Sequence, residues 1–276
     1  MNSAMTENSQ RVRIRGVQCP QDGLQRGAGL LMTATMVPPV SAVSRSDPSE
    51  RLDDYLEALR FYLGVPATTI DRILFVDNSA ADIDPIVEAA RRIAHDKHVE
   101  IISFQGNDHS PARGKAWGEF KLMDYGLAHT TLFGPQDVVW KTTGRLKFLN
   151  LHEIARALRD GSFDLVCDLH NLPWIGSGNW RDNHYMDLRV FAFRVEAYNA
   201  LFRDTWRERH SGYDAKFLYH RVFDARDIHR IIPRFPLQPR LQGISGSHSR
   251  DYSASSQRIK DNVRGLLRRV VPSLWV

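Results

Sequence analysis

The chain has 276 residues, of which 42% are hydrophobic and 25% charged, a balance typical of a globular protein with a substantial core. Two cysteines are too few for a disulfide framework, and no apolar run reaches the roughly 18 residues that a membrane-spanning helix needs. These features exclude a disulfide-rich secreted domain and favour a cytoplasmic protein. The net charge of +5 is compatible with nucleic acid, a membrane surface or a phosphorylated substrate as partner, and does not choose among them.

Residues 1–28 contain no secretory signal and are predicted to form a disordered leader, so one folded domain is expected over residues 29–276. In its first part, apolar runs alternate with amphipathic stretches. Pro48–Leu63 has apolar residues at helical spacing behind Asp47, which predicts an N-capped helix. This alternation predicts an α/β fold with a mostly parallel central sheet flanked by helices. Strands are expected at 29–36, 72–76 and 99–104, and a second helix at 83–94.

Asp137–Asn150 is the stretch around which the rest is arranged. Its apolar start predicts a buried strand, which ends in a Thr-Thr-Gly-Arg turn before a helix near Leu151. The carboxyl ends of strands in an open α/β sheet are where ligands bind. The hydroxyl of Thr143 and the guanidinium of Arg145 suit an anion such as a diphosphate. The alternative is an ordinary turn with solvated cations.

Several motifs in sequence carry a family resemblance. They are LLMTATM at the first strand, RLDDYL in the helix, ILFVDNS at the second strand, then GKAWGE, KTTGRL and GISGSHSRDY. Taken in this order, the chain resembles a group of bacterial glycosyltransferases with a GT-A-like fold that act on cell-surface polysaccharides. The resemblance implies a nucleotide-sugar donor and a glycan or lipid-linked acceptor.

Metal dependence stays open at this stage. Most GT-A enzymes hold a divalent cation, Mn²⁺ or Mg²⁺, through an Asp-x-Asp triplet, and this sequence has none. Asp168 and His170 form an Asp-x-His pair that is able to ligate a metal, or that merely ends a strand. The cations Arg145 and Lys115 are the alternative source of positive charge for the leaving diphosphate.

Glycosyl transfer needs a nucleotide pocket, positive charge for the departing diphosphate and a base for the acceptor hydroxyl. A general base for the acceptor hydroxyl is expected at Asp187, with Asp168 as second choice. Asp77 and its neighbours have an alternative role as a turn and helix cap, and Glu119 has one as a helix-dipole carboxylate. Trp174 and Trp180 are candidates for stacking on a sugar. The residues expected at the donor are Thr33, Thr35, Arg45, Asp77, Asn78, Lys115, Glu119, Thr143, Arg145 and Ser245.

The C-terminal stretch 257–270 predicts a basic amphipathic helix. It suits peripheral contact with anionic lipid at the inner face of the membrane, or simple packing on the domain. Two rival functions remain. A nucleic-acid-binding protein is weakened by the absence of a recognised motif, and a nucleotidyltransferase by the absence of clustered carboxylates for two metals.

Overall fold

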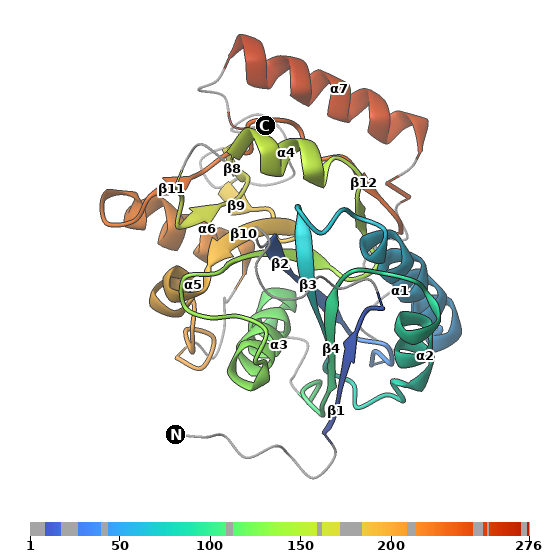
Figure 1. Cartoon of the computed structure of the whole chain (residues 1–276). Coiled ribbons are helices and arrows are strands. Elements are labelled where there is room, and N and C mark those ends of the chain that lie inside the picture. The colour runs from blue at the N-terminus through green and yellow to red at the C-terminus, as the bar shows by residue number, and fades with distance from the viewer. Residues whose placement is uncertain are drawn as a thin grey trace.

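A mixed eight-stranded sheet forms the centre of the molecule (Figure 1). The computed structural model describes residues 9–17, 27–39, 44–108, 113–158, 162–171, 184–208, 214–244, 251–252, 254–271 and 275. The strand order is β1-β4-β3-β2-β5-β10-β7-β11. These strands are β1 (Gln10–Arg15), β2 (Ala28–Ala34), β3 (Ile70–Asp77), β4 (His98–Ser103), β5 (Val138–Thr143), β7 (Leu165–Val166), β10 (Val190–Arg194) and β11 (Ile231–Ile232).

Two small ribbons and seven α-helices complete the described part of the fold. The ribbons pair β6 (Lys147–Phe148) with β12 (Leu241–Gln242), and β8 (Leu169–Asn171) with β9 (His184–Met186). The helices are α1 (Pro48–Leu63), α2 (Asp84–Arg92), α3 (Lys115–His129), α4 (Leu151–Leu158), α5 (Val195–Leu201), α6 (Ala215–Asp224) and α7 (Ser255–Val270), with a 3₁₀ turn, η2 (Ala225–Asp227), after α6.

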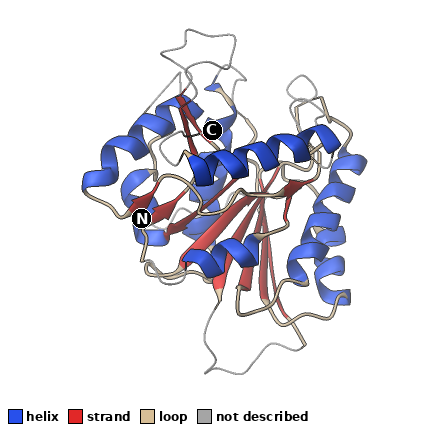
Figure 2. Cartoon of the chain, turned by 90° about the horizontal axis from the view of Figure 1, so that it is seen from above, coloured by secondary structure: helices blue, strands red, loops and turns tan. Residues whose placement is uncertain are grey.

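Helices cover both faces of the sheet (Figure 2). Alternate residues of β2 point to opposite faces, so Leu30 and Met32 join the core beneath α1, α2 and α4, whereas Leu31 joins the core beneath α3, α5 and α6. β2, β3, β4 and β5 are parallel, and β10 is antiparallel to its neighbours β5 and β7. The predicted α/β class with a mostly parallel central sheet flanked by helices is confirmed.

The chain reverses its direction across the sheet at β2. β3 and β4 extend the sheet to one side of β2, and β5 joins the other side. Ligands in such sheets bind outside the carboxyl ends of the strands at this switch point. Here those ends belong to β2 and β5, whose Thr33 and Thr143 are register partners.

α1 is the helix that its local sequence predicts. The Asp47 carboxylate accepts a hydrogen bond from the Ser49 amide at 2.8 Å, and Pro48 occupies the first turn. Its buried face includes Tyr55 and Tyr62 but also one cation, Arg51. A charge on the buried face of an amphipathic helix needs polar partners, and these belong to the site below.

Part of the predicted leader is in fact a strand. Residues 10–15 form β1, antiparallel to β4 at the edge of the sheet. The cause is a long-range ion pair that local sequence does not reveal. The Nε atoms of Arg11 and Arg13 donate to Glu100, a fully buried carboxylate of β4 that also accepts from the Thr130 hydroxyl at 2.6 Å. Charged edge strands of this kind also resist pairing with other chains.

Replacing Glu100 with glutamine is expected to lower the free energy of unfolding at pH 7 by about 1 to 3 kcal/mol, because two arginines lose their anionic partner. Burial alone would raise the pKa of Glu100. The hydrogen bonds from Thr130, Arg13 and Arg11 lower this pKa by more than burial raises it, so the net shift is downward. A lowered folded-state pKa gives stability that is present above about pH 4.3 and is lost as pH falls.

Urea denaturation between pH 7 and pH 3 would measure this effect, and Glu100→Gln should show the weaker acid dependence. Glu88→Gln is the matched control, because Glu88 forms an exposed pair with Arg92 at 2.9 Å. That variant should lie within about 0.5 kcal/mol of the parent. Equal pH dependence in the parent and in Glu100→Gln would contradict the role given to β1.

Candidate functional site

The Thr-Thr-Gly-Arg turn lies directly on the end of β2. The Gly144 amide donates to the Thr33 carbonyl at 2.9 Å, which ties the turn to the switch point. A β-carbon at Gly144 would lie 2.8 Å from that carbonyl oxygen, so the close approach requires glycine. The next residue, Arg145, is thereby held beside the first helix.

Three arginines (Arg45, Arg51 and Arg145) and two carboxylates (Asp54 and Glu50) lie around this turn. Arg51, on α1, donates from Nε to the Thr35 carbonyl at 2.7 Å and from a terminal nitrogen to the Tyr55 hydroxyl at 3.2 Å. Arg145 lies over the Tyr55 ring, 5.9 Å from its centroid, and 3.8 Å from Asp54. Arg51 and Arg145 are only 4% and 7% exposed, so their charges are largely removed from water.

The carboxylates of the cluster mainly neutralise Arg45 and not Arg51 or Arg145. Asp54 forms a bidentate pair with Arg45, at 2.6 and 3.1 Å, and Arg45 also contacts Glu50. The hydrogen bonds that Arg51 makes to described residues go to neutral oxygens. Burial, and then repulsion by Arg145, lowers the pKa of Arg51. The buried guanidinium groups of Arg51 and Arg145 are therefore neutralised only in part by Asp54, which already pairs with Arg45.

Arg145 has an unsatisfied donor. Its terminal nitrogen donates to the Ile244 carbonyl at 3.3 Å, while its buried Nε–H has no acceptor among the described residues. Buried donors of this kind are rare in native proteins and call for an explanation. An anionic oxygen between Arg51 and Arg145 would satisfy the Nε–H and compensate both charges.

The start of α3 borders the same end of β2. Glu119 accepts a hydrogen bond from the Thr33 hydroxyl at 3.1 Å and pairs with the buried amine of Lys141. Lys115 precedes Glu119 by one helical turn, so both residues lie on the same face of α3. Burial lowers the pKa of Lys115. Gly114, with φ of 83°, begins the helix without a capping side chain among the described residues.

Asp77 has a structural role. Its oxygens accept hydrogen bonds from the Met36 amide at 2.8 Å, from the Ser79 amide and hydroxyl, and from the Ser103 hydroxyl at 2.8 Å. The carboxylate is fully buried, and a fourth residue, Ala81, donates to it from its amide. No lone pair is left for a ligand, so the turn-forming alternative explains Asp77. It holds the loops after β2 and β3 in place.

Other predicted donor residues hold together the loops of this region. The Thr35 hydroxyl donates to Asn78 at 2.7 Å, which links the loops after β2 and β3. The Thr143 amide donates to the Arg189 carbonyl at 2.9 Å, which connects β5 to the loop before β10. Ser245 lies outside the described residues, as do Trp174 and Trp180.

The two carboxylates expected to act as general base are both engaged by arginines. Asp187 accepts two hydrogen bonds from the Arg189 guanidinium through Nε, at 2.9 and 3.0 Å. Burial raises the pKa of Asp187, but Arg189 outweighs it and holds that pKa well below the ordinary value. Asp168 pairs with Arg268 and accepts from the Phe235 amide at 2.9 Å. Both carboxylates are therefore placed to hold arginines.

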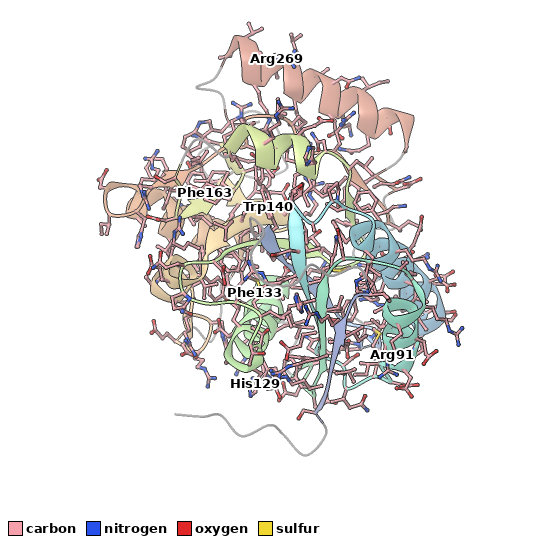
Figure 3. All side chains as sticks on the ribbon, viewed as in Figure 1. Arg91, His129, Phe133, Trp140, Phe163 and Arg269 are labelled. Carbon is pink, nitrogen blue, oxygen red and sulfur yellow. The ribbon has the colours of Figure 1, made fainter. Side chains whose placement is uncertain are left out.

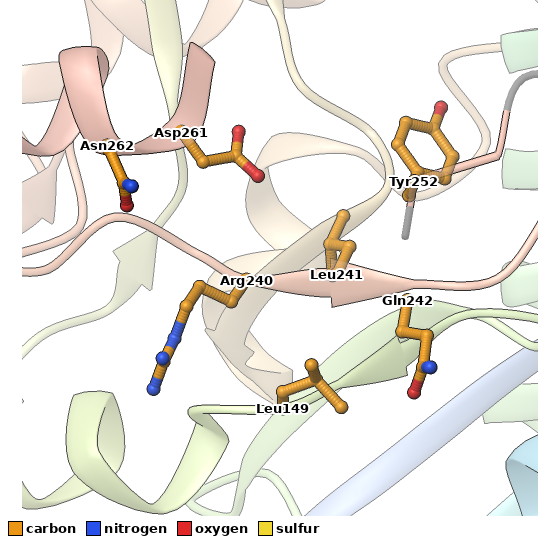
Figure 4. A pocket seen from close by; sticks show the side chains of 7 residues that line it. All are labelled: Leu149, Arg240, Leu241, Gln242, Tyr252, Asp261 and Asn262. Atoms are coloured by element: carbon orange, nitrogen blue, oxygen red, sulfur yellow. The ribbon is translucent and has the colours of Figure 1, made fainter. Parts of the chain in front are cut away.

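A hollow of about 350 Å³ lies next to this region, between α7 and β12 (Figure 4). Asp261 and Asn262 line it from α7, and Leu241 lines it from β12. Tyr252 lines the hollow too, and its ring lies 5.0 Å from the Arg189 guanidinium. Since the Arg189 carbonyl binds Thr143, the hollow adjoins the carboxyl end of β5.

Asp261 is the carboxylate of this hollow that is suited to take a proton. Burial raises its pKa above the ordinary value, which a hydrogen bond from Gln257 at 3.0 Å only partly offsets. Among the described side chains, the cation that pairs with Asp261 is Arg264, at 3.8 Å, too far for a hydrogen bond. Asp261 thus has a raised pKa and no arginine within hydrogen-bond distance among the described side chains, whereas Asp187 has a lowered pKa and is bound by Arg189.

Metal ligands do not cluster in the part of the chain that the structure describes. No group of three or more His, Cys, Asp or Glu side chains is arranged there to hold an ion. Of the predicted Asp-x-His pair, Asp168 binds Arg268, while His170 is buried against the Tyr185 ring with centroids 4.4 Å apart. Burial lowers the pKa of His170.

Four residues of this site did not come from the sequence: Arg51, Tyr55, Tyr252 and Asp261. The first had a detectable signal, because it is a charge on the apolar face of a predicted helix. The position of Tyr252 and Asp261 depends on how α7 lies on the domain, which no local pattern encodes.

Comparison with known proteins identifies no family for this chain. No family model and no curated protein matches this chain. Among solved structures, 4-diphosphocytidyl-2C-methyl-D-erythritol synthase from Anaerococcus prevotii is 15% identical, with a TM-score of 0.43 and coverage of 87% of this chain and 96% of that one. A second structure of that synthase is 10% identical, at TM-score 0.43 and coverage of 87% and 100%.

A mouse protein, xyloside xylosyltransferase 1, is 11% identical, at TM-score 0.38 and coverage of 72% and 82%. These likenesses concern the fold alone. They assign no activity, so the activity has to be argued from the residues of the site. In the described part of the chain, no helix combines the length and apolar character needed to cross a bilayer.

Proposed function

We propose that this chain is a glycosyltransferase that transfers a sugar from a nucleotide-sugar donor to a glycan or lipid-linked acceptor in cell-surface polysaccharide synthesis. The observation that carries the proposal is the under-neutralised pair of Arg51 and Arg145 at the switch point. A buried positive pair with an unsatisfied donor suits the diphosphate of such a donor. An adjoining hollow offers space for the acceptor.

The donor would lie across the ends of β2 and β5. Its diphosphate oxygens would accept hydrogen bonds from Arg145 and Arg51, with Lys115 approaching from the start of α3. The nucleoside would face Thr35 and Asn78, whose hydroxyl and amide already lie together. Gly144 lets the phosphate chain approach the backbone closely.

The acceptor would occupy the hollow beneath α7. Its hydroxyl oxygen attacks the anomeric carbon of the donor sugar, the bond from that carbon to the diphosphate oxygen breaks, and the nucleoside diphosphate leaves with the electron pair. Asp261 takes the hydroxyl proton. The arginines stabilise the negative charge that develops on the leaving group. Asp187 and Arg189 support this geometry from behind Tyr252.

A panel of UDP-, GDP-, CDP- and ADP-sugars, tested for thermal stabilisation with and without Mn²⁺ and Mg²⁺, examines the donor class and its metal requirement together. A ligand at one hundred times its Kd stabilises the native state by about 2.7 kcal/mol. Product analysis then identifies the reaction. A nucleoside diphosphate supports glycosyl transfer, whereas inorganic pyrophosphate formed from a nucleoside triphosphate would show a nucleotidyltransferase. Stabilisation by oligonucleotides alone would show a nucleic-acid-binding protein.

A further inference from the structure

The C-terminal helix α7 is bound to the domain by polar contacts. Arg268 donates to Asp168 at 2.9 Å, to the Phe235 carbonyl at 3.0 Å and to Gln238 at 2.8 Å. Asp261 lies about two helical turns before Arg268 on the same face of α7, and it lines the hollow described above. The inward face of α7 is therefore polar and charged, the reverse of a helix that packs by its apolar side.

The outward face of α7 carries the apolar residues. Ile259, Val263, Leu266 and Val270 are spaced by four, three and four residues, so they form one stripe along the helix. They are 64%, 51%, 62% and 68% exposed. In Figure 1, α7 lies along the margin of the molecule, with α4 on its inner side and no labelled element beyond it. A continuous aliphatic stripe of this exposure marks an interaction surface.

Cations flank this stripe on both sides. At 100° per residue, Lys260 lies about 100° from Ile259 in one direction and Arg269 about 80° in the other. Both side chains are exposed. Figure 3 places Arg269 on α7 at the periphery of the molecule, away from the sheet. Long basic side chains beside an aliphatic stripe are the arrangement of helices that lie in a bilayer interface.

We propose that α7 docks on the surface of an anionic lipid bilayer, with its aliphatic stripe at the boundary of headgroups and acyl chains and with Lys260 and Arg269 on the phosphates. A second copy of the chain is a poorer occupant. The 16-residue helix is about 24 Å long and presents a stripe one side chain wide, well short of the roughly 800 Å² per partner of a stable interface. Two-fold pairing would also bring the cations of both copies together.

If the proposed function holds, docking of α7 on lipid also brings the acceptor hollow to the membrane surface. The inner face of α7 lines the hollow assigned to the acceptor, and its outer face would rest on lipid. A lipid-linked acceptor would thus reach Asp261 along the bilayer surface. The docking itself requires no donor and no turnover.

The test is flotation of the full chain with vesicles of phosphatidylcholine alone or with 30 mol% phosphatidylglycerol, without any nucleotide sugar. We expect binding to the anionic vesicles, weaker binding at 0.5 M salt, and at least a tenfold loss of affinity in Leu266→Asp. Lys260→Glu combined with Arg269→Glu should lose at least tenfold as well, since each cation near such a surface contributes about 1 kcal/mol.

Ile228→Asp is the matched control, because Ile228 is 83% exposed on the turn after η2 and lies outside α7. It should bind vesicles like the parent. Circular dichroism and melting temperature show that each variant is folded. Wild-type protein that stays unbound at low salt, or a folded Leu266→Asp that binds normally, would overturn the proposal. A lipid-free dimer that Leu266→Asp dissociates would assign the face to a second copy.

Discussion

Replacing Arg145 with alanine is expected to weaken binding of the stabilising nucleotide by about 10- to 100-fold, since a charge-assisted hydrogen bond contributes about 1.5 to 3 kcal/mol. Arg145 is the member of the arginine cluster with a buried donor that no described residue satisfies. Titration calorimetry with the nucleoside diphosphate of the donor identified in the panel measures the change. Arg145→Lys should retain part of the affinity, because it keeps the charge but loses the planar fork.

Loss of a buried arginine also affects stability, so a control outside the site is needed. Arg72 is equally buried, and it pairs with Asp71 at 2.9 Å and Asp137 at 2.8 Å at the opposite end of β3. Arg72→Ala should reduce stability and leave nucleotide affinity unchanged in the folded fraction. Equal affinity losses in Arg72→Ala and Arg145→Ala would mean that Arg145 acts only on folding.

The elements that sequence predicted well are those with local signals. α1 begins at Pro48 and ends at Leu63 as expected, because its cap and its apolar spacing lie within one segment. The four parallel strands β2–β5 were also predicted, because each contains a short run of apolar residues. The strand β1 was missed because Arg11 and Arg13 are stabilised by Glu100, nearly ninety residues away in the chain.

Site residues were harder to predict, because a sequence shows which side chains are charged but not which are neutralised. Asp187 and Asp168 were predicted to act as general base, and they are held by Arg189 and Arg268. The second pair joins residues 100 positions apart. Arg145 was correctly expected at the carboxyl end of a central strand, where the sheet topology alone determines its position.

The amphipathic pattern of α7 was visible in sequence, but not its orientation. Apolar spacing normally indicates the buried side of a helix. Here the inward side carries Arg268 and Asp261, because the segments beneath it offer Asp168, Gln238 and the Phe235 carbonyl to Arg268. The groups on the domain surface beneath a helix therefore decide whether its polar or its apolar face is buried.

Asp261→Asn is expected to lower kcat by about 10²- to 10⁴-fold while leaving donor affinity unchanged, because the amide cannot accept the acceptor proton. Asp261→Glu should recover part of the activity. Burial raises the pKa of Asp261, so the acidic limb of kcat should lie above the value of about 3.9 for an ordinary aspartate, with activity lost as pH falls through it. Steady-state kinetics across pH with the identified donor would measure both effects.

Asp187→Asn provides the decisive contrast with Asp261→Asn. It would leave Arg189, whose side chain is 30% exposed, without its anion, and loss of such a charged hydrogen bond costs about 1.5 to 3 kcal/mol. The Asp187 variant should therefore lose stability first, and any fraction that folds should retain turnover. A stable Asp187→Asn protein without turnover, together with an Asp261→Asn protein of normal kcat, would identify Asp187 as the general base instead of Asp261. The two variants thus separate a carboxylate that holds an arginine from one that accepts a proton.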